Sequence, residues 1–136
     1  MQLEEQVTSL ELSKKLKELG IKQESLFYWK TYRPDQFDKA PHPKIINFKE
    51  EPGFSEDSLY SAFTVAEFGR MFGKLMILSG YIPRFKHYSC KYFYGSTVVN
   101  QFVAGTEADA RALMLIYLLE NSLIEIPNRS PEKLAA

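Results

Sequence analysis

The longest uninterrupted run of apolar residues lies near the C-terminus, at residues 112–119. Most of these residues are good helix formers, and Thr106 with Asp109 supplies a capping-box pattern just before them. Glu107 and Asp109 also place negative charge at the positive end of the helix dipole. Few polar residues interrupt the apolar surface, so the pattern predicts a helix over residues 106–121 that is buried on several sides. A helix in a subunit interface is the alternative.

A second helix is predicted close to the N-terminus. Thr8 and Glu11 form a capping-box pattern before leucines at positions 12, 16 and 19, which follow helical spacing. Gly20 follows as the expected left-handed stop. The pattern predicts a helix over residues 9–19.

A third capping-box pattern, Thr64 with Glu67, begins another predicted helix. Apolar residues at positions 65, 68 and 72 form one stripe, and Gly73 is suited to end the helix. Residues 74–78 fit either an extension of this helix or a turn into a strand. Residues 80–83 predict a turn because they combine glycine with proline.

Aromatic and β-branched residues predict the strands. Residues 26–32 are mostly aromatic and residues 44–48 are mostly apolar, so each predicts a strand. Residues 85–94 and 97–104 predict a hairpin, because Gly95 is the favoured first residue of a type II′ turn.

A two-residue turn fixes which hairpin residues face each other. It pairs Tyr94 with Thr97, Tyr92 with Val99, Cys90 with Gln101 and Tyr88 with Val103. The other face pairs Phe93 with Val98, Lys91 with Asn100, Ser89 with Phe102 and His87 with Ala104. The first face is the predicted core side, and the second is mixed.

The predicted order is α-β-β-α-β-β-α, which indicates an α+β fold with an antiparallel sheet of about four strands and helices packed on it. The last helix is expected to cross the sheet. We predict one globular domain over residues 1–126, with a long, proline-rich loop at 33–58 that resembles an exposed flap. Residues 127–136 are predicted to form a C-terminal tail.

Composition adds few functional constraints. The chain of 136 residues balances 17 basic against 17 acidic residues, so its global charge favours neither nucleic acid nor membrane surfaces. Its one cysteine, Cys90, suits a reducing compartment, and its acidic N-terminus does not resemble a secretory signal. The apolar run is too short to span a bilayer. We therefore expect a cytoplasmic protein without a membrane partner.

Three segments resemble blocks of small uncharacterised phage and prophage proteins: residues 8–29 (TSLELSKKLKELGIKQESLFYW), 61–72 (SAFTVAEFGRMF) and 106–121 (TEADARALMLIYLLEN). Residues 64–121 are also similar, more weakly, to the phage "ABA sandwich" domain. The resemblance implies a phage-related accessory protein. It carries no catalytic residues over to this chain.

Candidate catalytic and metal-binding residues are few. His87 and Cys90 are three residues apart on a predicted strand, which places them on opposite faces, and His42 is distant in sequence. No Cys–His signature surrounds Cys90. Glycines 69, 73 and 80 match neither phosphate-binding nor dinucleotide-binding spacing. We therefore expect no metal, no cofactor and no enzymatic activity.

Residues 12–29 partly fit a helix-turn-helix motif, with Gly20 in the turn. That motif requires a second helix over residues 23–29. The bulky Leu-Phe-Tyr-Trp run offers few donors for DNA bases, so the helix–strand interpretation is preferred.

The clearest asymmetry of charge lies in the hairpin region. Residues 68–106 contain no Asp or Glu, but they contain several cations interleaved with aromatic residues. Such mixtures bind single-stranded nucleic acid by stacking bases and following phosphates. The candidate binding residues are Arg84, Lys86, His87, Lys91 and Phe93.

The sequence thus favours a small, non-enzymatic accessory protein that binds another protein, with self-association as a further expectation. A nucleic-acid-binding module that uses hairpin residues 84–94 is the alternative. The predicted contact surfaces are the mixed hairpin face, the apolar helix at 106–121 and the flap.

Overall fold

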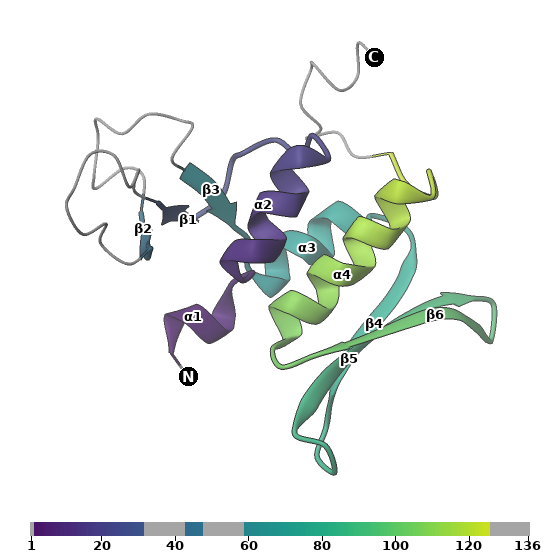
Figure 1. The fold of residues 1–136 in the computed structure, drawn as a ribbon. Helices are drawn as coiled ribbons and strands as arrows, with labels where there is room; N and C mark the ends of the chain where they lie inside the picture. The colour runs from purple at the N-terminus through teal and green to yellow at the C-terminus, as the bar shows by residue number, and fades with distance from the viewer. Residues whose placement is uncertain (1, 32–42, 48–58, 126–136) are drawn as a thin grey trace.

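The structure, a computed structural model, describes residues 2–31, 43–47 and 59–125 (Figure 1). Its elements along the chain are α1 (Leu3–Gln6), α2 (Leu10–Glu18), β1 (Phe27–Lys30), β2 (Lys44–Ile46), β3 (Leu59–Ala62), α3 (Val65–Phe72), β4 (Met76–Ile82), β5 (His87–Tyr94), β6 (Thr97–Ala104) and α4 (Glu107–Glu120).

The α+β class is confirmed, but the sheet differs from the prediction. The described residues form two three-stranded antiparallel sheets in place of one sheet of about four strands. The N-terminal sheet has the order β2-β1-β3, and the C-terminal sheet is a β4-β5-β6 meander. The predicted element order lacked α1, β3 and β4.

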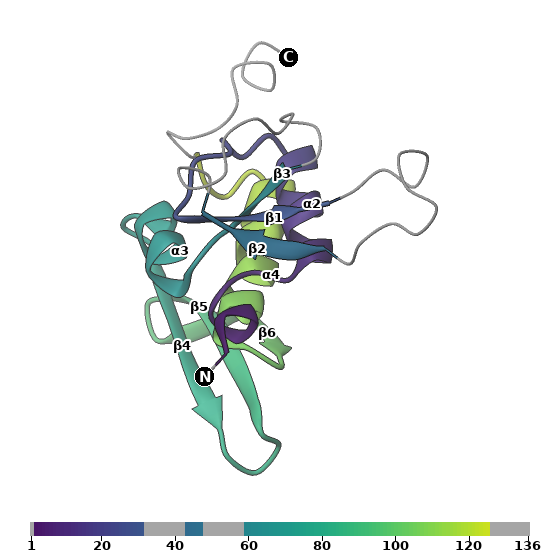
Figure 2. The same ribbon diagram turned by 90° about the vertical axis from the view of Figure 1, so that its left-hand side faces the viewer.

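Helix α4 is the centre of the fold. It lies across one face of the C-terminal sheet, and α2 and α3 pack against it (Figures 1 and 2). The N-terminal sheet packs against α2 through β3. Fully buried residues of α4 include Met114, Leu115 and Leu118, so the prediction of a core helix is confirmed. No helix within the described ranges is long and apolar enough to cross a membrane.

The predicted capping box is confirmed in full at α3 and in part at α4. At α3 the capping box is complete: the Thr64 hydroxyl accepts from the Glu67 amide, and the Glu67 carboxylate accepts from the Thr64 amide. At α4 the Thr106 hydroxyl accepts from the Asp109 amide, as predicted. The carboxylate of Asp109 does not return to that cap, because it accepts from a more distant donor.

That donor is the backbone amide of Ser9, at 2.7 Å from Asp109 Oδ1. Ser9 is the N-cap of α2, so Asp109 satisfies an amide at the start of a different helix. The predicted capping box at Thr8 is wrong, because the Thr8 hydroxyl donates instead to the carbonyl of Phe63. Burial raises the pKa of Asp109, and the hydrogen bond from Ser9 opposes that effect.

Strand β4 is the main element that the sequence did not predict. Helix α3 ends at Gly73, which adopts a positive φ of 60°, and the chain enters β4 at Met76. Of the two interpretations of residues 74–78, the turn into a strand is therefore confirmed. The predicted turn at residues 80–83 is wrong, since residues 80–82 belong to β4 and the chain reverses at residues 83–86.

The hairpin of β5 and β6 forms as predicted near its turn, with Tyr94 opposite Thr97 and Phe93 opposite Val98. Beyond that point a β-bulge leaves Val99 out of register, and Tyr92 pairs with Asn100. A shift of one residue turns the rest of a strand over, because side chains alternate between faces.

Because of this shift, the residues predicted to face the core are correct on β5 and wrong on β6. On β5, Tyr88, Cys90 and Tyr92 pack in the core as predicted. On β6, Phe102 and Ala104 occupy the positions that the prediction gave to Gln101 and Val103.

The strand predictions at 26–32 and 44–48 are confirmed in shorter form by β1 and β2. The predicted tail at 127–136 and most of the predicted flap at 33–58 lie outside the described residues. The single domain over residues 1–126 stays a prediction.

Candidate interaction surface

The two faces of the C-terminal sheet have different environments. One face contacts α4 and includes Ile77, Cys90 and Phe102. The alternating residues point to the opposite side, where no described element packs (Figures 1 and 2). We call this side the open face, and we define it by Met76, Leu78, Lys91, Phe93, Val98 and Val103.

The open face is apolar and exposed. Met76, Leu78, Val98 and Val103 are between 42% and 57% exposed, although they occupy neighbouring positions on three strands. Met76 pairs with Phe93, which pairs with Val98, so one row of the face is apolar across all three strands. Large contiguous apolar patches are uncommon on monomeric proteins and mark interaction sites.

The charge on the open face is positive. Lys91 lies in the next row, between Leu78 and Gln101, and His87 lies further along the same side of β5. All three strands fall within residues 68–106, so the sheet itself contains no carboxylate. A ligand with negative charge beside an apolar surface therefore matches this face.

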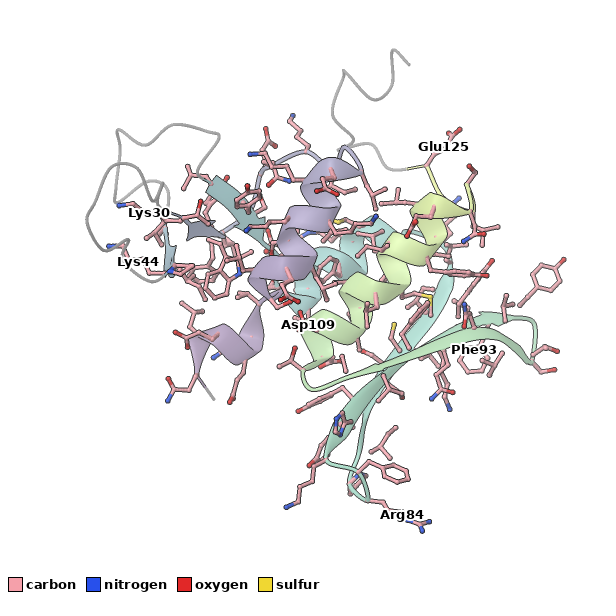
Figure 3. The ribbon with its side chains drawn as sticks, viewed as in Figure 1. Lys30, Lys44, Arg84, Phe93, Asp109 and Glu125 are labelled. Atoms are coloured by element: carbon pink, nitrogen blue, oxygen red, sulfur yellow. The ribbon has the colours of Figure 1, made fainter. Side chains whose placement is uncertain are left out.

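The structure brings together only some of the predicted binding residues. His87, Lys91 and Phe93 share the open face because they alternate along β5. Arg84 lies at the tip of the β4–β5 hairpin, far from Phe93 (Figure 3). Lys86 follows Arg84 in the same turn and lines a pocket on the other side of the hairpin. The five residues therefore do not form one site.

The aliphatic half of the open face was missed from the sequence. The sequence pattern does not decide whether Met76 and Leu78 lie in a helix or a strand, and it places Val103 on the core side. The run MILSGYI at residues 76–82 is apolar at most positions and gave a strand signal. However, Gly80 lies three residues before Pro83, and this combination favours a turn over a strand.

The pocket that Lys86 lines has a volume of about 500 Å³. It lies between α1, the first residues of α3 and α4, and the distal part of the β4–β5 hairpin. Tyr81 and Tyr88, whose ring centroids are 5.0 Å apart, form part of its wall with Phe27. Glu5 and Glu107 also line the pocket, so its charges are mixed.

A polar cluster joins α4 to β4 on the covered face. The Ser79 hydroxyl donates to the Glu107 carboxylate and accepts from Arg111 Nε at 2.9 Å. Arg111 also donates to the carbonyl of Val65 at 3.4 Å. These contacts fix the position of α4 relative to β4 and α3.

Cys90 lies opposite Ser79 on the neighbouring strand and is fully buried. Burial raises the pKa of its thiol from 9.0 to about 11, although nearby Arg111 lowers it and Glu107 adds to the increase. At neutral pH the thiol is therefore protonated, whereas nucleophilic cysteines are thiolates.

The raised pKa of Cys90 predicts a loss of stability at alkaline pH. Between pH 9 and about pH 11 the unfolded state loses the thiol proton first, so the free energy of unfolding falls as pH rises. The full difference corresponds to about 3 kcal/mol. Urea unfolding at several pH values is expected to show a steeper alkaline decline for the wild type than for Cys90→Ala. The same alkaline decline in both proteins would contradict this prediction.

Two further sequence hypotheses have clear outcomes. Residues 27–30 form strand β1, so the second helix of a helix-turn-helix motif is absent from this position and the preferred interpretation is confirmed. Within the described ranges no three His, Cys, Asp or Glu side chains gather as metal ligands would. His42 lies outside those ranges.

Comparison with known proteins adds no relative to this picture. No family model, no curated protein and no solved structure matches the chain. The interpretation of the open face therefore rests on its own chemistry.

Proposed function

We propose that this protein is a non-enzymatic binding protein that uses the open face to bind another protein. The observation that carries the proposal is the exposure of Met76, Leu78, Val98 and Val103 on one side of a sheet whose other side is covered by α4. Burying such side chains against a partner is favourable by about 25 cal/mol for each Å² of apolar surface removed from water.

The side chains of the open face favour a protein over a nucleic acid. Single-stranded nucleic acids bind by stacking their bases on aromatic rings. Of the six residues that define the open face, only Phe93 is aromatic, and the others are aliphatic residues, a methionine and a lysine; the imidazole of His87 lies at the far end of the same side. Aliphatic surface matches the apolar side chains of a protein partner.

The positive charge on the open face indicates which charge a partner protein should carry. Lys91 lies between Leu78 and Gln101 and next to the apolar row, so a partner that covers it must supply a carboxylate or leave a buried charge unpaired. His87 lies further along the same strand face. The partner is therefore expected to present an apolar surface that contains or borders Asp or Glu side chains.

A phage-related role for this protein is supported by its sequence alone. The resemblance of residues 8–29, 61–72 and 106–121 to phage and prophage proteins supports a phage-related accessory role in the cytoplasm of a bacterial cell.

Capture experiments with matched variants test the proposal. Leu78→Glu and Lys91→Glu each change the open face, whereas Lys15→Glu makes the same charge change on the exposed side of α2. We expect proteins captured from a bacterial lysate by the wild type to be retained by Lys15→Glu. Both open-face variants are expected to weaken their binding by about 30-fold or more, as for a central interface residue. Equal capture by all four proteins would refute the proposal.

The same variants decide whether nucleic acid is the ligand instead. The acid-free stretch at residues 68–106 is the observation that favours this alternative. It predicts that the wild type binds labelled single-stranded DNA at low salt, and that affinity falls steeply as salt increases. Loss of that binding in Lys91→Glu, without loss of any protein partner, would replace the first proposal with the second.

A further inference from the structure

Strand β6 forms one edge of the C-terminal sheet, because the strand order is β4-β5-β6. An edge strand presents unpaired backbone groups to which another strand can add. Natural edges are usually short, covered, twisted by a β-bulge, or marked by lysine or proline. The two sheets of this protein differ in this respect.

The edges of the N-terminal sheet are protected. Strand β2 has three residues and begins with Lys44. Strand β3 has four residues and packs against α2, where Lys17 Nζ donates to the carbonyl of Leu59 at 3.0 Å. Both edges therefore have features that prevent the addition of a further strand.

Strand β6 has one of these features, the bulge at Val99 near its start, and lacks the others. It has eight residues, Thr97–Ala104, without a charged residue, a proline or a glycine. Val99 and Val103 are each 46% exposed, and valine favours strands. The amide of Gln101 donates to Asn100 Oδ1 of its own strand at 2.8 Å, a contact that an added strand can replace. Edge strand β4 is also uncharged, but Gly80 in its interior weakens it for pairing.

We propose that two copies of this protein pair through β6, antiparallel and about a two-fold axis perpendicular to the sheet. Strand β6 then meets its own copy, so every cross-strand neighbour is uncharged and no like charges meet. The product is a six-stranded antiparallel sheet. Both α4 helices lie on one side of it, and both open faces lie on the other.

Charge decides between this arrangement and stacking of the two open faces. Stacking brings Lys91 and His87 of one copy onto the acid-free sheet of the other. Pairing through β6 separates the two β5 strands by three strand spacings, or about 14 Å. Charges at that distance are largely screened at physiological salt, where the Debye length is about 8 Å. Edge pairing therefore avoids the repulsion that stacking creates.

The test is the oligomeric state of the full chain, measured by sedimentation velocity from about 1 µM to about 1 mM, a range that covers weak dimers. We expect a reversible monomer–dimer equilibrium in the wild type. Gln101→Pro removes the outward amide and is expected to weaken dimerisation by about tenfold or more, because proline cannot donate to a strand ladder. Gln101→Ala, its matched control, keeps the amide and the dimer.

Two further variants make the test decisive. Val103→Lys replaces Gln101→Pro if circular dichroism shows that the proline variant is unfolded; it places a charge on the edge and also on the open face, so its effect is compared with that of Leu78→Glu, which changes the open face alone. Leu78→Glu changes the open face on β4 and is expected to leave the dimer intact. The proposal is overturned if the wild type is monomeric at every concentration, or if it forms oligomers larger than dimers. It is also overturned if Leu78→Glu abolishes the dimer while the edge variants keep it. The proposed partner binding at the open face is tested separately by the capture experiment.

Discussion

Glu67→Ala is expected to lower the free energy of unfolding by about 3 kcal/mol, a large effect for one side chain outside the apolar core. Glu67 is 7% exposed, and both of its carboxylate oxygens accept hydrogen bonds. Oε1 accepts from the Thr64 amide at 2.9 Å, and Oε2 accepts from the Leu26 amide at 3.3 Å. Alanine removes both acceptors; a hydrogen bond to a charged group contributes about 1.5–3 kcal/mol, and the bond from Leu26 contributes at the lower end because Leu26 is 59% exposed and water can replace the carboxylate there.

Urea denaturation of Glu67→Ala beside Glu67→Gln measures this effect. Glutamine keeps one oxygen acceptor and nearly the same shape, so we expect it to lose about half as much stability as alanine. Equal stability of the alanine variant and the wild type would show that water replaces the carboxylate without cost. The contact matters beyond α3, because Leu26 immediately precedes β1 and joins the helix to the N-terminal sheet.

Leu118→Ala is expected to cost about 3 kcal/mol of stability through the cavity that it leaves in the core. Leu118 is fully buried on α4, within the cluster that also contains Phe68 of α3 and Leu16 of α2. Because this cluster joins side chains from three helices, α2, α3 and α4, they cannot all collapse into the space without moving a helix.

Leu113→Ala is the matched control, since it makes the same change on the same helix at a partly exposed position outside that cluster. We expect it to cost about 1 kcal/mol or less, in line with its partial burial. Thermal and urea unfolding of both variants measure the difference. Similar losses for the two leucines would contradict the assignment of α4 as the centre of the core.

Local signals predicted the helices well. Capping at Thr64 and Thr106, the apolar run of α4 and the stop at Gly73 all depend on residues close in sequence, and each is present in the structure. Helix α1 and strand β3 are only four residues long, so they offered too little periodicity to detect. Their structure depends on packing with distant parts of the chain.

The candidate surface was predicted by region but not by face. The absence of acids from residues 68–106 is a property of the sequence, and the structure places β4, β5 and β6 within that stretch. Which side chains share a face depended on the register of β6, and the bulge at Val99 changed that register by one residue. Such a bulge has no clear sequence signature here, since Val99 is an ordinary strand residue.

The hydrogen bond between Asp109 and Ser9 has a consequence for synthesis of the protein on the ribosome. The two residues are 100 positions apart, and α4 follows every other described element along the chain. At a translation rate of about 5–20 residues per second, α2 emerges about 5–20 seconds before the helix that buries it. During that interval the apolar side of α2 waits for its partner; α3 waits for a shorter time, and the C-terminal sheet is completed just before α4. The final packing of these elements therefore waits until α4 has been synthesised, and until then the apolar side of α2 is accessible to chaperones that bind apolar segments.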